Sequence, residues 1–395
     1  MEIEQMGKST SSHEYDGPYF ILHHDRLRPG DIILERGYEM HSDIICKNTG
    51  SHYSHAMIYV GGTIIEATRD GGVFSRIPNR SAVRAISDFK VLRLAKDPGR
   101  EITTILCNQA RYLVGSQYSV AEAILVKGPV FTRQFRENSR KQFCSRLVAQ
   151  CYKEAGINLV SDANFCSPAD LERSGFLVTV PDMVRPASEQ EAAFALEVSP
   201  HASHAKNTVR FVEAALVILK NHGIKTVGDS DGEVTVTTLN DITQAVFENR
   251  TSPGLDGEMT EAMQASGYLD HIEMDRQQNP FRYDFDLFSA RISKNADGNE
   301  ISERLWGEVN KEAQVLVPRL QSYISGRDNL VWGLKYFEAE FSIYEGLLQA
   351  LYDRTVIIVE YSVLKKDIPF FSEINELSNA ILNEIRKYAP EIAIS

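Results

Sequence analysis

The sequence predicts an α+β protein in which an antiparallel sheet and a cysteine-bearing helix come first and a mostly α-helical region follows. Two observations lead to this class. Residues 20–180 alternate short strand patterns with a few helical ones, whereas residues 205–395 carry apolar side chains at three- and four-residue spacing. At 395 residues, the chain has room for two to three domains of about 150 residues each.

Changes in pattern along the chain predict the domain boundaries. The expected parts are an N-terminal extension (1–24), a strand-and-helix domain (25–180), a linker (181–204) and a helical domain (205–395). The linker is predicted from prolines separated by small polar residues, namely Pro181, Pro186 and Pro200. His201 and His204 lie in this linker without a third metal ligand, so we expect them to be solvated.

Two long stripes of apolar residues, spaced three or four positions apart, support the prediction of a helical second half. One stripe consists of Leu330, Leu334, Phe337, Phe341, Tyr344, Leu348 and Leu351. The other consists of Ile374, Leu377, Ile381, Ile385 and Tyr388. Each predicts an amphipathic helix that packs its apolar face into a core.

Composition excludes several classes of protein. Apolar residues make up 43% and charged residues 24%, as in ordinary globular proteins, and no apolar run approaches the roughly 18 residues of a membrane span. The N-terminus has no basic segment followed by an apolar one, so we expect a cytoplasmic protein. Its five cysteines are scattered without a CxxC pair, which argues against disulfides and a zinc ribbon. We expect no metal and no organic cofactor.

Charge is divided unevenly along the chain. Residues 51–150 hold 15 Lys and Arg against 7 Asp and Glu, whereas residues 151–395 hold 22 against 38. The basic zone suits an anionic substrate or a membrane surface, and the alternative is complementarity with the acidic half. Nucleic acid is not an expected partner, because the sequence pI is about 5.4 and no basic, aromatic-rich domain is present.

The segment of residues 54–68 predicts a hairpin around the two-residue turn Gly61-Gly62. Pairing across that turn gives one apolar face and places His55 and Glu66 together on the other. They are diagonal neighbours at roughly 7–8 Å, close enough for their side chains to meet. A three-residue loop would instead move Glu66 to the opposite face.

Residues 141–156 predict a helix that ends at Gly156, and Cys144 lies in its first turn. The positive end of a helix dipole favours a thiolate, and a paired histidine favours it further. These are the requirements of a cysteine nucleophile. The other four cysteines are interpreted as small buried apolar residues.

Six segments in this order resemble the permuted NlpC-type papain-like hydrolases, in particular the YiiX-like branch. They are residues 27–34 (LRPGDIIL), 54–61 (SHAMIYVG), 65–67 (IEA), 115–118 (GSQY), 143–148 (FCSRLV) and 167–171 (SPADL). The histidine strand precedes the cysteine helix, the reverse of ordinary papain-like enzymes. Lecithin retinol acyltransferase-like proteins share this order, but Ser145-Arg146 here replaces their typical Glu-His pair.

The resemblance covers roughly residues 25–175 and implies a catalytic triad. Cys144 would be the nucleophile, His55 the general base and Glu66 the residue that orients the imidazole. Substrate binding is expected from three further residues, namely Tyr118, Ser54 and Ser145.

The expected activity is therefore hydrolysis through an acyl-enzyme by a peptidase- or amidase-like thiol hydrolase. Amide, isopeptide, thioester and ester bonds all suit this chemistry, so a peptide, an amide or an acyl lipid is the expected substrate. One alternative is a lipid-directed acyltransferase or lipase in peripheral contact with a membrane. Another is a non-catalytic binding module whose helical domain recruits a partner.

Overall fold

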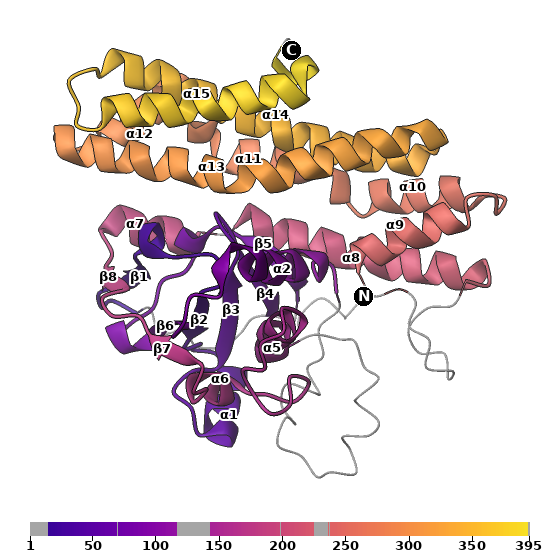
Figure 1. Ribbon diagram of the computed structural model, residues 1–395, viewed down its shortest axis with the longest axis horizontal. Coiled ribbons are helices and arrows are strands. Elements are labelled where there is room, and N and C mark those ends of the chain that lie inside the picture. The colour runs from indigo at the N-terminus through magenta and orange to yellow at the C-terminus, as the bar shows by residue number, and fades with distance from the viewer. Residues whose placement is uncertain are drawn as a thin grey trace, which may run out of the picture.

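The computed structural model of the protein describes residues 15–68, 70–116, 143–197, 199–224, 236 and 238–393. All the described strands lie in the first half of the chain, together with shorter helices, and long helices make up the second half (Figure 1). The predicted α+β class, an antiparallel sheet followed by a mostly helical region, is confirmed.

The described strands form one large and one small antiparallel sheet. They are β1 (Phe20–Leu22), β2 (Ile32–Glu35), β3 (His55–Tyr59), β4 (Ile64–Thr68), β5 (Gly72–Arg76), β6 (Phe89–Leu94), β7 (Leu177–Thr179) and β8 (Val184–Pro186). The large sheet has the order β5-β4-β3-β2-β6-β7, and β1 pairs with β8 in the small one. Strand β3, which begins with His55, therefore lies in the interior of the large sheet.

The hairpin of β3 and β4 has the predicted register. Ile58 lies opposite Ile65. The turn residues Gly61 and Gly62 have φ angles of 90° and 68°, as a type I′ turn requires at both of its central positions. The two-residue turn thus keeps Glu66 on the strand face that the sequence predicts.

Among the described residues, four shorter helices accompany the large sheet: α1 (Met40–Thr49), α2 (Gly99–Tyr112), α5 (Cys144–Glu154) and α6 (Pro168–Glu172). Helices α2 and α5 pack against each other, and α5 also contacts β3 and β4. The apolar face of the hairpin, including Ile58 and Ile65, shares one buried core with Leu106 of α2 and Leu147 of α5. This core fixes α5 relative to the strand that carries His55.

Residues 181–204, which were expected to form a linker, contain regular structure. They include β8, the helix α7 (Glu189–Leu196) and the start of α8 at Pro200. Pro186 ends β8, and Pro200 is the first residue of α8, where a missing N–H is tolerated. Pro186 and Pro200 therefore mark the ends of elements, whereas Pro181 lies in the turn between β7 and β8.

The helices of the second half are α8 (Pro200–Asn221), α9 (Leu239–Glu248), α10 (Leu255–Ala265), α11 (His271–Gln278), α12 (Phe285–Ser293), α13 (Gly298–Asn329), α14 (Lys335–Leu364) and α15 (Phe371–Tyr388). One core joins α12 to α15, and a second joins α8, α9 and α10 to the start of α14. The two predicted stripes lie on α14 and α15, except that Leu330 belongs to a 3₁₀ turn and Leu334 precedes α14.

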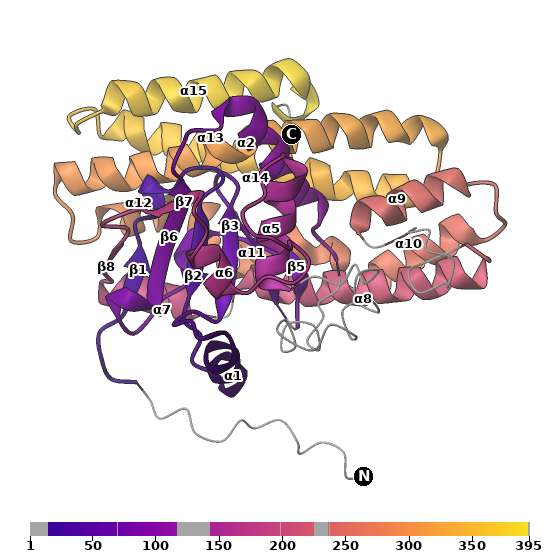
Figure 2. The same ribbon diagram turned by 60° about the horizontal axis from the view of Figure 1, so that its bottom comes forward.

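In Figure 1, helices α13, α14 and α15 form a layer above the strand-bearing half, and α8 runs beneath that layer. In the turned view of Figure 2, the strand-bearing half overlaps this layer and α8 still runs below it. Helix α8 contacts β5, so it joins the two halves along one edge of the sheet. The tip of the β3–β4 hairpin reaches α13, where Gln314 accepts hydrogen bonds from Gly62 N–H (2.5 Å) and the Tyr59 hydroxyl.

No described helix has both the length and the apolar character that crossing a membrane would require.

Candidate active site

Cys144 is the first residue of α5, in agreement with the predicted first-turn position. Phe143 before it is extended, with φ −137° and ψ 162°, and the helix begins at the cysteine. Leu147 and Val148, one turn later, are fully buried and hold this end of the helix on the sheet. The first N–H groups of a helix have no partner within it, so this end of α5 favours a negative charge.

The surroundings of Cys144 favour its thiolate. Burial raises the pKa of the thiol, but the hydrogen bond to His55, the charge of His55 and the backbone N–H groups of Ala56 and Ser145 outweigh burial, and the pKa lies below its ordinary value. The other four thiols show the opposite direction. Burial raises the pKa of Cys46, Cys107, Cys151 and Cys166, that of Cys107 to about 11.

His55 connects the thiol to a carboxylate. Its Nε2 lies 2.6 Å from Oε2 of Glu66, which leaves Nδ1 as the nitrogen for Cys144. Burial lowers the pKa of His55, yet the hydrogen bonds and charges of Cys144 and Glu66 raise it well above its ordinary value. The three groups thus favour a thiolate and an imidazolium side by side.

The carboxylate of Glu66 is in turn paired with a buried arginine, Arg76. Arg76 Nε donates to Oε1 of Glu66, and Arg76 Nη2 lies 3.9 Å from Oε2 of Glu35. Glu35 lies directly opposite His55 on β2 and also accepts a hydrogen bond from Ser81 (3.2 Å). Burial raises the pKa of Glu35, so Arg76 serves mainly as the counterion of Glu66.

Arg76 and Glu35 were not predicted from the sequence. Alternation along residues 72–76 places Arg76 on the same strand face as Phe74, which lies opposite Glu66. That signal is present in the sequence, but it becomes usable only once β5 is known to pair with β4. Glu35 could be found only from the pairing of β2 with β3.

Of the three predicted substrate-binding residues, the structure describes two. Ser54 Oγ accepts a hydrogen bond from Gly37 N–H (2.9 Å), and Ser145 Oγ donates to the Cys166 carbonyl (2.8 Å), so both hydroxyls are engaged within the protein. Only the backbone of Ser54 and Ser145 faces the Cys144 sulfur. Tyr118 lies outside the described residues.

His201 and His204 are not solvated, so that prediction is wrong. Both lie on α8 and pack against His271 of α11 with tilted rings, their centroids 5.7 Å and 4.0 Å from that of His271. Burial lowers the pKa of His201 to about 4 and that of His271 to about 3. Among the described residues, no three His, Cys, Asp or Glu side chains are arranged to hold a metal ion. The error arose because α8 begins at Pro200, inside the segment expected to be a linker.

The comparisons with known proteins concern the first half of the chain. Residues 26–175 match the family described as permuted papain-like amidase enzymes, YaeF/YiiX, C92 family. A crystal structure of the metalloprotein yiiX from Escherichia coli O157:H7 is similar at 20% sequence identity and a TM-score of 0.30, covering 39% of this chain and 96% of that one. No curated protein matches the chain. The family match confirms the YiiX-like resemblance and supports a hydrolase enzyme over a non-catalytic module.

Proposed function

We propose that Cys144, His55 and Glu66 are the catalytic triad of a cysteine hydrolase, since residues 26–175 match the family of permuted papain-like amidases. The observation that carries the proposal is the continuous chain from the Cys144 thiol through His55 to Glu66, with 2.6 Å between the imidazole and the carboxylate. A thiol, a base and a group that orients the base are the components of nucleophilic acyl transfer.

In the proposed reaction, the Cys144 thiolate attacks the substrate carbonyl carbon and the carbonyl oxygen becomes negative. The N–H of Cys144 itself, at the start of α5, is one donor for that oxyanion. His55 then donates its proton to the leaving group, and an acyl-cysteine forms. Water attacks the acyl-cysteine with His55 as the base, which releases the acid and restores the thiolate.

Glu66 keeps the imidazole oriented throughout. Its hydrogen bond to Nε2 fixes the ring so that Nδ1 faces the sulfur, and its negative charge stabilises the imidazolium. We place an amide or peptide bond first among the substrates because the matched family is one of amidases. Isopeptide, thioester and ester bonds use the same steps and are alternatives within this mechanism.

Acylation by 4-nitrophenyl acetate tests the proposal without knowledge of the natural substrate. We expect a burst of nitrophenolate and an acetyl group on Cys144 by peptide mass spectrometry. Cys144→Ala should abolish both and His55→Ala should slow the burst by about 100-fold or more, because the general base is lost. Cys46→Ala, which removes the most exposed of the other thiols, is the matched control and should leave the burst unchanged. Nitrophenolate release that is independent of Cys144 would refute the assignment.

A further inference from the structure

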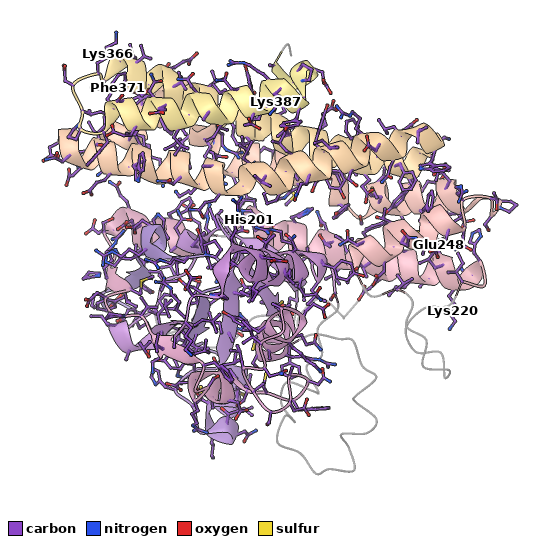
Figure 3. All side chains as sticks on the ribbon, viewed as in Figure 1. His201, Lys220, Glu248, Lys366, Phe371 and Lys387 are labelled. Carbon is purple, nitrogen blue, oxygen red and sulfur yellow. The ribbon has the colours of Figure 1, made fainter. Side chains whose placement is uncertain are left out.

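A second polar site lies between the two halves of the protein, away from Cys144. It is a cavity of about 80 Å³ that Gly62 and Thr63 of the hairpin tip line on one side and helices α7, α8 and α11 to α14 line on the others. His201, one of its lining residues, lies in Figure 3 between the strand-bearing half and the α13 layer. The hairpin tip is the end of β3 opposite His55, about five residues or roughly 17 Å along the strand.

The three carboxylates that line this cavity already have cationic partners. The pairs are Arg354–Glu312 (2.7 and 2.8 Å), Lys311–Glu308 (2.7 Å) and Arg282–Asp275 (3.7 Å). Each pair is neutral as a unit. The net charge of the cavity is therefore set by the cations that remain.

Two lining arginines make no ion pair within 4 Å among the described residues. At longer range, Arg291 interacts electrostatically with Glu308 and Glu197, and Arg319 with Glu312. Arg319 donates from Nη1 to the Leu347 carbonyl at 3.1 Å. Arg291 stacks on Phe281, with its guanidinium carbon 4.0 Å from the ring centroid. Burial lowers the pKa of Arg319, but only to about 10, so it stays charged at neutral pH. The cavity consequently carries a net charge of about +2.

Two neutral histidines also line the cavity and can donate hydrogen bonds. His201 Nε2 and His271 Nδ1 are shielded from solvent and have no hydrogen-bond partner among the described residues. Because burial keeps both imidazoles neutral at pH 7, each can present one N–H to a ligand without adding charge.

Arg291 is exposed to solvent, but Arg319 is half-buried, and a half-buried charge without an ion-pair partner is costly. A bound counter-anion reduces that cost. The volume is several times the roughly 10–15 Å³ that one water needs, so a group of the size of phosphate fits. The planar guanidinium groups of two arginines also match the oxygen geometry of a phosphate.

We propose that this cavity is a binding site for a phosphate dianion, either free or as the phosphomonoester of a small molecule. The anion would be held by Arg291 and Arg319 with hydrogen bonds from His201 and His271. Gly62 and helices of the second half line the same cavity. The bound anion would therefore also stabilise the contact between the β3–β4 hairpin and α13.

Calorimetric titration of the full-length protein at pH 8 and constant ionic strength tests this site. The probes are inorganic phosphate, methyl phosphate and dimethyl phosphate. We expect saturable binding of the first two, which are mainly dianions, and binding about tenfold or more weaker for the monoanionic dimethyl phosphate. Tighter binding of inorganic phosphate would identify the free anion as the ligand, and tighter binding of methyl phosphate would identify a phosphomonoester.

Substitutions distinguish phosphate binding in this cavity from nonspecific electrostatic attraction of phosphate to the protein. Arg319→Gln should weaken phosphate binding about tenfold or more, Arg319→Lys should weaken it less, and Arg386→Gln, on the exposed face of α15, should have no effect. Phosphate should raise the thermal midpoint of the wild type but not that of Arg319→Gln, which should be at least as stable as the wild type without phosphate. The proposal is overturned if the wild type shows no saturable binding, or if Arg319→Gln and Arg319→Lys both bind phosphate like the wild type.

Discussion

Glu66 is the residue on which the geometry of the site depends most. Its side chain is only 6% exposed and contacts His55 on one carboxylate oxygen and Arg76 on the other. Burial alone would raise the pKa of Glu66, but Arg76 and His55 lower it to about 2. The carboxylate therefore stays ionised in a place where an isolated carboxyl group would be protonated.

Removing Arg76 should leave the ionised carboxylate of Glu66 without its counterion. We expect Arg76→Gln to destabilise the protein by about 3 kcal/mol, since breaking a buried pair leaves an uncompensated charge behind. The pKa of Glu66 should rise and the reactivity of Cys144 at low pH should fall. Urea denaturation measures the first effect, with Arg100→Gln, an exposed arginine, as the control that should be nearly neutral. Equal unfolding midpoints for Arg76→Gln and Arg100→Gln would contradict this account.

The pKa of Glu66 also predicts how stability depends on pH. Because the folded pKa of about 2 lies below the ordinary value of 4.5, the ionised carboxylate stabilises the folded state fully above pH 4.5. This contribution should be lost as the pH falls from 4.5 towards 2. The difference in unfolding free energy between wild type and Glu66→Gln should shrink over the same range. A difference that stays constant over that range would show that Glu66 has no lowered pKa.

At the scale of elements, the parts of the site predicted from sequence are those set by local signals. The Gly61-Gly62 turn fixes the register of β3 against β4, and the apolar stripe of residues 143–151 fixes the start of α5. The structure accordingly brings together the three residues assigned to the triad. Arg76 and Glu35 could not be predicted because their positions depend on which strands lie next to the hairpin.

Two glycine substitutions test how the turn of the β3–β4 hairpin packs on α13. Gly62 and Gly50 both have positive φ, 68° and 64°, but a Cβ on Gly62 would lie 2.7 Å from a methyl group of Val315, whereas Gly50 has open space. Gly50→Ala should therefore cost only the backbone term of about 1–2 kcal/mol. Gly62→Ala should cost more, by about 1 kcal/mol or above, because the tip must move away from α13. Equal losses in urea denaturation would mean that the tip does not pack on α13.

At the scale of the whole molecule, the two halves share polar contacts that neither half could satisfy alone. Arg80, which is buried, donates to the Phe194 carbonyl (2.7 Å) and to Asn279 Oδ1 (2.8 Å), and stacks on the Phe194 ring. These contacts connect the strand-bearing half, α7 and the segment between α11 and α12. They indicate that the helical half is a fixed part of the structure around the hairpin.

We expect this connection to appear as thermodynamic coupling. A double-mutant cycle of Arg80→Gln and Asn279→Ala should give an interaction energy of about 1 kcal/mol, measured by urea denaturation, because the two side chains meet directly. The cycle of Arg80→Gln with Asn375→Ala, on distant α15, should be additive. Additivity of the first pair would indicate that the two halves are energetically independent.

Contacts between the halves were also the hardest features to predict. The imidazole cluster joins His201 and His204 to His271, about seventy residues further along the chain, and no local pattern relates them. The regular elements within residues 181–204 were not predicted either, because prolines end elements as readily as they fill loops.

The pH dependence of iodoacetamide alkylation at Cys144, read by peptide mass spectrometry, tests the central claim that Cys144 and His55 form an activated pair. The other four thiols serve as internal references in the same sample. We predict that Cys144 reacts well below the pH near 8.5 at which an ordinary thiol ionises, and that His55→Ala moves its profile upward. A Cys144 profile like those of the reference thiols, unchanged in His55→Ala, would contradict the account.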